Sequence, residues 1–466
     1  MDEASVSGTE YGGVKLGDRR LERRLPRIAQ ALEEEPRRSF PEALDTAELE
    51  AFYRFVNNDR VTPEAVFAPH RDETVKRCAP EELVVSVADT STFQFSTSRE
   101  GLGRYGDRTF FGHFALALNL EGTPLGVLGM ETWVRTEDSV SAKKRRGELS
   151  QVEAAELPKE QDRWGRMVDH VEDALWGVAP VVHVMDSEAD DYALLQSLVG
   201  DERRFVIRGG GNRRLLLDDG SPGKMQDVVA SCPVRCTREV RLSKRRGKKL
   251  KGTSGGKKRP RETPRDVRTA KLSIGAVAVR IKAPNHFRGE RKSIAVNVVS
   301  VREAKAPEHM HPVEWFLMTT EPIDTREDIL RVVDLYRSRW KVEEFFKALK
   351  TGCRYEERQF GSYEALTNLL AILVPIAWKL LRLRTLSRVD ADRPATDVLS
   401  ESELLVLRHV AEKKLRKNPT LEEAMAAIAR YGGHLRSNGR PGWLTLSRGY
   451  FRLQDLAIGF ELARNL

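Results

Sequence analysis

The segment from Val332 to Lys350, VVDLYRSRWKVEEFFKALK, combines a helical hydrophobic pattern with a row of polar side chains. At about 100° per residue, one side of the predicted helix is apolar, and it carries Leu335, Val342, Phe345, Phe346 and Leu349. Along its border lies a second row, made of Tyr336, Arg339, Glu343 and Lys350. A carboxylate flanked by a guanidinium, an ammonium and a phenol suits a metal ion beside phosphate oxygens. Taken alone, the pattern is more typical of an amphipathic helix with ordinary ion pairs.

Two aspartates upstream each follow a short run of apolar, β-branched residues. LVVSVAD places Asp89 after one predicted strand, and PVVHVMD places Asp186 after another. We expect both carboxylates at the carboxyl ends of strands, where open α/β sheets gather their ligands. A single aspartate at such a position is often only a turn former or a helix N-cap. Together with Glu343, however, the two aspartates form a set that can bind two hard divalent cations.

The three acids and the helical signature resemble those of DDE transposases of the insertion-sequence-four family. The signature consists of Tyr336, Arg339, Glu343 and Lys350, separated by two, three and six residues. Other matching segments extend over most of the chain: LGDRRLERRL, AFYRFVNND, GHFALALNLEGTPLGVLGMETWVR, DSEADDYALLQ, FVIRG and EWFLMTTEP. Ser187 and Asn57 depart from the pattern, because arginines are expected there, so the DNA contacts of these two positions stay open.

The resemblance implies a DNA transposase that performs cut-and-paste transposition through nicking, hairpin formation, hairpin opening and strand transfer. Asp89, Asp186 and Glu343 would be its catalytic residues and its metal ligands, with Mg²⁺ as the cofactor and Mn²⁺ as a substitute. The residues implied to contact DNA are Tyr336, Arg339, Lys347, Lys350, Trp315, Arg24, Arg54 and Arg208. Trp315 would stack on a flipped base, although a core tryptophan explains its position equally well.

Two other functions are compatible with the same residues. A non-catalytic DNA-binding protein could regulate transposition, but the presence of all three acids argues against lost chemistry. A metal-dependent nuclease without strand transfer would use the same triad, and it would differ in whether cut ends are joined to a target.

The patterning predicts an α/β protein with three domains. Residues 1–68 form a helical module, which the resemblance implies recognises transposon ends. Residues 69–361 carry three antiparallel strands followed by helix, strand, helix and strand, which is the element order of a ribonuclease-H-like core. Residues 210–321 interrupt this core as a β-rich insertion. Residues 362–466 form a helical domain.

Two features of these domains leave alternatives open. The apolar stripe at Leu404, Leu405, Leu407 and Val410 predicts either packing within the chain or a dimer interface, and we expect a homodimer on DNA. His113 lies in a predicted hairpin, where a satisfied histidine in the sheet is a simpler explanation than a contact with the metal.

The net charge indicates only a mild attraction to polyanions, and the resemblance implies that the partner is double-stranded DNA. The 466 residues carry a formal net charge of +9, with basic runs at Arg19–Arg24, Lys143–Arg146 and Ser243–Arg261. A solvated surface explains any one run equally well. Four cysteines in so long a chain indicate a reducing compartment. Leu366–Leu381 is interrupted by polar residues and is too short to span a bilayer, so we expect a buried helix and a soluble protein. The resemblance implies a bacterial cytoplasmic protein, which joins the nucleoid when bound to DNA.

Overall fold

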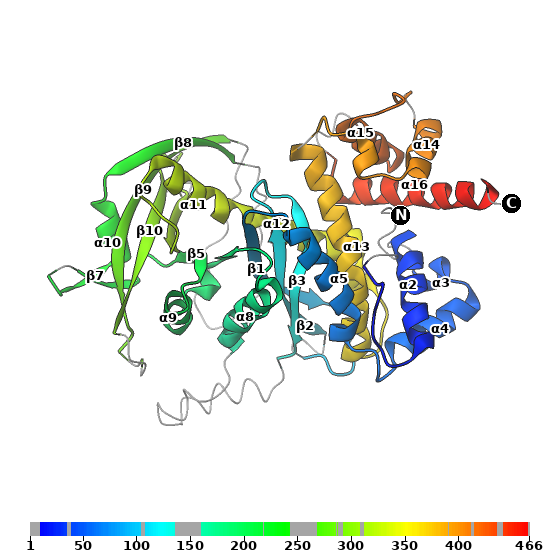
Figure 1. Cartoon of the computed structure of the whole chain (residues 1–466), viewed down its shortest axis with the longest axis horizontal. Helices are drawn as coiled ribbons and strands as arrows, with labels where there is room; N and C mark the ends of the chain where they lie inside the picture. The colour runs from blue at the N-terminus through cyan, green and yellow to red at the C-terminus, as the bar shows by residue number, and fades with distance from the viewer. Residues whose placement is uncertain are drawn as a thin grey trace. The chain divides into compact units, whose positions relative to one another are not determined.

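The computed structural model describes residues 10–34, 39–103, 108–135, 160–217, 219–242, 268–285, 287, 292–307, 312–389, 391–411, 414–435 and 441–464. The chain divides into two compact units. The first contains residues Met1–Val181 and Arg339–Leu466, and the second contains the residues between them. Both are built from helices and strands, so the predicted α/β class is confirmed (Figure 1).

Three antiparallel strands lie at the centre of the first unit: β1 (Val84–Gln94), β2 (Thr109–Leu118) and β3 (Pro124–Trp133). β2 and β3 form the predicted hairpin, in which the Gly122 N–H donates to the Asn119 carbonyl and Gly122 adopts a φ of 79°. Every residue of β2 is buried. The helices that pack on these strands are α5 (Pro63–Cys78), α8 (Arg163–Leu175), α12 (Trp340–Lys347) and α13 (Tyr363–Val389).

Asp89 lies in the middle of β1, so the prediction that it ends a strand is wrong. It stands opposite Phe114 of β2, and the pairing continues to Gln94 opposite Thr109. The strand continues because β-branched Thr92 and aromatic Phe93 pair with two phenylalanines of β2, which favours further pairing over a turn.

The remaining helices of the first unit come from the two ends of the chain. They are α2 (Arg19–Glu34), α3 (Phe40–Ala43), α4 (Thr46–Val56), α14 (Glu401–Val410), α15 (Leu421–Tyr431) and α16 (Trp443–Arg464). One face of α2 is apolar and buried, with Leu25 and Leu32 fully enclosed, whereas Arg19, Arg20 and Arg23 are exposed. In α14, Leu404 and Leu407 are buried where the helix packs on α15 and α16. Packing within the chain therefore accounts for this part of the apolar stripe.

α13 is longer than the apolar stretch predicted from the sequence. It has 27 residues and includes Pro375. By length and composition it passes as a membrane span, but 89% of its most apolar window is buried inside the protein. It packs on α5 and β3, as a core helix does (Figure 1). The prediction of a buried helix is confirmed.

A mixed sheet forms the second unit, with strand order β4-β5-β11-β10-β9-β6-β7 and with β8 paired to β9. Its strands are β4 (Val181–Met185), β5 (Arg204–Gly209), β6 (Arg214–Leu216), β7 (Pro222–Lys224), β8 (Val234–Leu242), β9 (Arg268–Lys282), β10 (Ser293–Glu303) and β11 (Glu314–Thr319). β4 and β5 are parallel, and the other pairs are antiparallel. The helices α9 (Tyr192–Gly200), α10 (Met225–Ala230) and α11 (Arg326–Ser338) pack on this sheet.

β9 is a single strand across a glycine in the β-rich segment. It covers two short apolar runs, Ala270–Ile274 and Ala276–Ile281, that Gly275 separates in the sequence. Gly275 does not break it, because this residue pairs with Ser300 on one side and with Val234 on the other.

The single helix predicted from Val332 to Lys350 is also interrupted. α11 ends at Ser338, α12 begins at Trp340, and Ala348–Gly352 forms a π-helical turn that contains Lys350. The predicted apolar side is nevertheless buried throughout. Arg339 between the helices keeps helical dihedrals, with φ −49° and ψ −33°, so the hydrophobic period continues through the break and cannot reveal it.

Candidate active site

Two of the three predicted catalytic carboxylates meet at one guanidinium. Arg339 donates from Nη1 to Asp89 Oδ2 and from Nη2 to Glu343 Oε1, both at 2.8 Å. Asp89 projects from β1, and Glu343 from the first turn of α12, which packs on β1. Two carboxylates that bond to the same guanidinium lie close enough to repel each other. The shared positive charge of Arg339 therefore stabilises their proximity.

A partly buried polar network holds the β1 backbone beside Asp89. The Thr90 N–H donates to Asp89 Oδ1 at 2.7 Å. The Thr90 hydroxyl bonds to His113 Nδ1 at 2.9 Å and accepts from Arg163 Nε at 3.1 Å. Neither Thr90 nor Arg163 was predicted from the sequence, and the only signal for Thr90 is its position next to Asp89.

His113 is buried within this network. Burial, assisted by the charge of Arg163, lowers the pKa of His113 to about 3. It is therefore neutral near pH 7. Its Nδ1 is bonded to Thr90, whereas its Nε2 has no hydrogen-bond partner among the residues that the structure describes. His113 is therefore a structural residue of the sheet, as expected, and it is not placed as an acid or base at the site.

Lys350 is held against β1 beyond the end of α12. Its Nζ donates to the Thr92 carbonyl, lies 3.2 Å from Glu356 Oε1 and lies 5.1 Å from the centroid of the Phe93 ring. Lys347, on the last turn of α12, is exposed.

The remaining residues of the implied centre belong to the second unit. Asp186 directly follows β4, as predicted, and caps the short helix Ser187–Ala189 by accepting the Glu188 N–H at 2.8 Å. Trp315 on β11 meets Tyr336 on α11 edge to face, with ring centroids 5.4 Å apart. Tyr336 is buried and Trp315 half-buried, a pairing that the sequence did not predict. Arg208 on β5 donates to the Glu314 carbonyl at 3.5 Å.

The two arginines implied to read DNA ends lie in the N-terminal helices. Arg24 on α2 is half-exposed, and Arg54 on α4 is exposed and forms an ion pair with Glu50. The predicted basic runs Lys143–Arg146 and Ser243–Arg261 lie outside the described residues.

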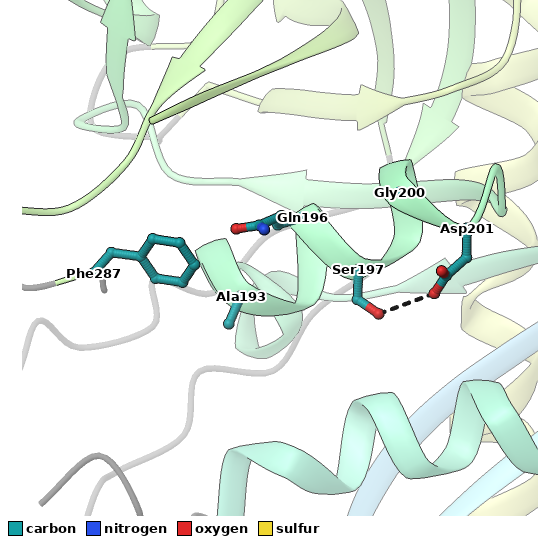
Figure 2. Close-up of a pocket in the computed structure, with 6 residues that line it drawn as sticks. All are labelled: Ala193, Gln196, Ser197, Gly200, Asp201 and Phe287. Carbon is teal, nitrogen blue, oxygen red and sulfur yellow. Dashed lines mark hydrogen bonds between the residues drawn. The ribbon is translucent and has the colours of Figure 1, made fainter. Parts of the chain in front are cut away.

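A separate hollow of about 440 Å³ opens beside α9 (Figure 2). It is lined by Ala193, Gln196, Ser197, Gly200, Asp201 and Phe287. Within it, the Ser197 hydroxyl donates to Asp201 at 3.2 Å (Figure 2). None of the predicted site residues lines this hollow, so it is not the candidate active site.

The donor set around Asp89 bears on metal binding. Among the side chains that the structure describes, no group of three or more His, Cys, Asp or Glu residues is arranged to hold a metal ion. The carboxylates of Asp89 and Glu343 nevertheless converge on a single cation, the guanidinium of Arg339. Mg²⁺ and Mn²⁺ prefer oxygen ligands such as carboxylates. Two carboxylates that converge on one cation therefore have the right chemistry for these ions.

Comparison with known protein families adds two matches. Residues 4–61 match the family described as transposase DNA-binding, and residues 150–378 match the transposase DDE domain. The chain therefore carries the two domains of a DDE transposase. Both descriptions agree with the predicted enzyme class and with the predicted DNA partner. Transposases of this kind use divalent metal ions.

The two matched regions contain some of the candidate site residues but not all of them. The DNA-binding match includes Arg24 and Arg54, and the DDE match includes Asp186 and Glu343, whereas Asp89 precedes the latter. Among solved structures, the cryo-EM structure of the piggyBac transposase synaptic complex with hairpin DNA aligns with 90% of this transposase at 10% identity. The transposase covers 61% of that chain, and the TM-score of 0.32 is too low to support an inference.

Proposed function

We propose that this transposase moves DNA by a cut-and-paste route, using metal-dependent phosphoryl transfer at Asp89, Asp186 and Glu343. The observation that carries the proposal is the shared contact of Asp89 and Glu343 with Arg339. The three carboxylates would hold two divalent cations, Mg²⁺ in the first instance with Mn²⁺ as a substitute. Bound there, the cations would neutralise charge on the phosphate and favour deprotonation of the attacking water or 3′-hydroxyl.

The order of elements supports a ribonuclease-H-like core for this chemistry. β1, β2 and β3 are followed by α8, β4, α9 and β5, and the strands β6 to β11 then precede α12 with Glu343. In this proposal Arg339 and Lys350 hold phosphates near the break, together with Tyr336, Lys347 and Arg208. Trp315 stacks on an extruded base.

The ends of the chain complete the proposal. Residues 1–68, with Arg24 and Arg54, recognise transposon ends of the insertion-sequence-four type. Residues 362–466 support a homodimer on DNA.

The first prediction tests the three acids. Asp89→Ala, Asp186→Ala and Glu343→Ala should each lower the cleavage rate by at least about 10³-fold, because several kcal/mol of charge stabilisation is lost. Binding to DNA that carries the terminal inverted repeats should stay near the wild-type level. Gel-based cleavage with Mg²⁺ and a binding titration measure the two effects. Glu121→Ala, in the turn between β2 and β3, is the control.

The products distinguish the alternatives. Cleavage by any one of the three variants at the wild-type rate would refute the assignment of that acid. If the wild-type protein cuts DNA but never joins the cut ends to a target, it is a nuclease. If it binds the inverted repeats and does not cut them, it is a regulator.

A further inference from the structure

Arg339 is enclosed together with the two acids that it contacts. The exposed fractions of the side chains are 13% for Arg339, 15% for Asp89 and 33% for Glu343. One oxygen of each carboxylate is bonded to the guanidinium, and the other oxygen of Asp89 accepts the Thr90 N–H. The acids are therefore already neutralised in part by a cation that belongs to the chain.

A divalent cation bound by Asp89 and Glu343 would compete with this guanidinium. Both cations are attracted to the same two carboxylates, and two positive charges a few ångströms apart repel strongly where water screens them poorly. The guanidinium has another partner of suitable shape, because the fork that bridges two carboxylates can also bridge two oxygens of a phosphate.

We propose that Arg339 is an internal counter-cation, which a divalent metal ion displaces from Asp89 and Glu343 and which a DNA phosphate then receives. The inference rests on the proposed function, since it takes the two acids as metal ligands. Metal and DNA then raise each other's affinity, because each stabilises the arrangement in which Arg339 has left the carboxylates. Without DNA, the carboxylates bind metal weakly, and DNA arrival prepares the site for its cofactor.

The test measures Mn²⁺ binding to the full chain by isothermal titration calorimetry, with no cleavage readout. Arg339→Gln should bind Mn²⁺ about tenfold more tightly than wild type, because the competing charge is removed. Arg339→Lys should lie between the two, since one ammonium does not bridge both carboxylates as the fork does. Arg337→Gln, which removes the exposed pair with Asp334, should behave as wild type.

The second arm adds duplex DNA carrying the terminal inverted repeats. DNA should tighten Mn²⁺ binding to wild type by about tenfold and leave Arg339→Gln nearly unchanged, because reciprocal coupling requires the mobile guanidinium. Equal Mn²⁺ affinities of wild type and Arg339→Gln would refute this inference and leave the metal site intact. So would equal tightening by DNA in both. Mn²⁺ binding that is absent, or indifferent to Asp89→Asn and Glu343→Gln, would instead refute the proposed metal site itself.

Discussion

His113 is enclosed by β2, Thr90 and Trp164, where a positive charge has little stabilisation. Its ring lies edge-on to Trp164 with centroids 4.5 Å apart, and the charges that help to lower its pKa, those of Arg163 and Arg166, are cations. The pKa of His113 is about 3 in the folded chain, against about 6.5 in an unfolded one. As the pH falls, His113 is therefore protonated in the unfolded chain before it is protonated in the folded chain.

We expect this difference to make the protein less stable in acid. Since the folded pKa is depressed, stability is present above about pH 6.5 and is lost towards pH 3, by up to about 1.4 kcal/mol per pH unit. His113→Gln should show a shallower loss of urea stability between about pH 7 and pH 5 than wild type. His170→Gln, which changes an exposed histidine of α8, should keep the wild-type slope. Identical slopes in all three proteins would contradict this expectation.

Trp315 offers a second prediction for a single side chain. Because extrusion of a base costs stacking energy that an aromatic platform partly offsets, Trp315→Ala should slow hairpin formation by roughly 10- to 100-fold and spare the first nick. An abasic nucleotide at the extruded position should restore part of the rate. Trp176→Ala, which removes a tryptophan that is 80% exposed, is the control. If nick and hairpin slowed equally and the abasic substrate gave no relief, Trp315 would be a core residue.

For single residues, the sequence predicts which side chains are candidates for the site better than it predicts the side chains that they contact. The spacing of Arg339 and Glu343 by four residues makes their pairing predictable on helical geometry. The bond from Arg339 to Asp89 joins residues far apart in the chain, and no local pattern encodes it. The same holds for Arg163 and Thr90, which β1 and α8 bring together through tertiary packing.

Among the elements, α5 anchors the beginning of the described chain. Glu10, with a side chain 3% exposed, bonds to His70 and lies 2.6 Å from Arg77 Nη1. His70 Nε2 accepts the Val127 N–H of β3, so its Nδ1 carries the proton donated to Glu10. One face of α5 thus ties a segment before α2 to the central strands.

Removal of this carboxylate should weaken the packing of α5. Glu10→Gln should lower the free energy of unfolding by about 3 kcal/mol, because buried His70 and the partly buried guanidinium of Arg77 lose their carboxylate partner. Glu50→Gln, which breaks the exposed pair with Arg54, should change it by less than about 1 kcal/mol. Chemical denaturation measures both, and decreases of equal size would show that the buried cluster contributes nothing special.

Element types were more predictable than element ends. The hairpin of β2 and β3, the helix α8 and the strand β8 follow from periodicity and turn residues. The extension of β1 past Asp89 and the continuity of β9 through Gly275 depend on neighbouring strands, which a single segment cannot report. The break at Arg339 leaves the apolar period in phase and is invisible for that reason.

For the whole molecule, the basic run Ser243–Arg261 supports a prediction from charge alone. Changing Lys248, Lys249, Lys257 and Lys258 to Gln should weaken binding to all DNA sequences alike. The slope of log affinity against log salt should fall by up to about 0.9 for each phosphate that the protein no longer neutralises. Binding titrations at several salt concentrations, on inverted-repeat and unrelated duplexes, measure the effect. Weaker binding restricted to the inverted repeats would contradict a non-specific role.

The three candidate acids are divided between the two units of the chain. Asp89 and Glu343 belong to the first unit, and Asp186 belongs to the second, shortly after the chain leaves the first at Val181. The chain returns at Arg339, the residue that bonds to both acids of the first unit. Both crossings therefore lie beside candidate residues, and a long β-rich excursion separates Asp186 from Glu343 in the sequence.

The burial of α13 also bears on how the chain is made. A ribosome releases the N-terminal part first, so α5 and β3, which cover α13 in the finished protein, have already emerged when this helix leaves the exit tunnel. This apolar helix can therefore pack on α5 and β3 as soon as it leaves the ribosome. A fragment that starts after β3 lacks that surface, and its newly made helix is exposed to membranes, chaperones and other unfinished chains.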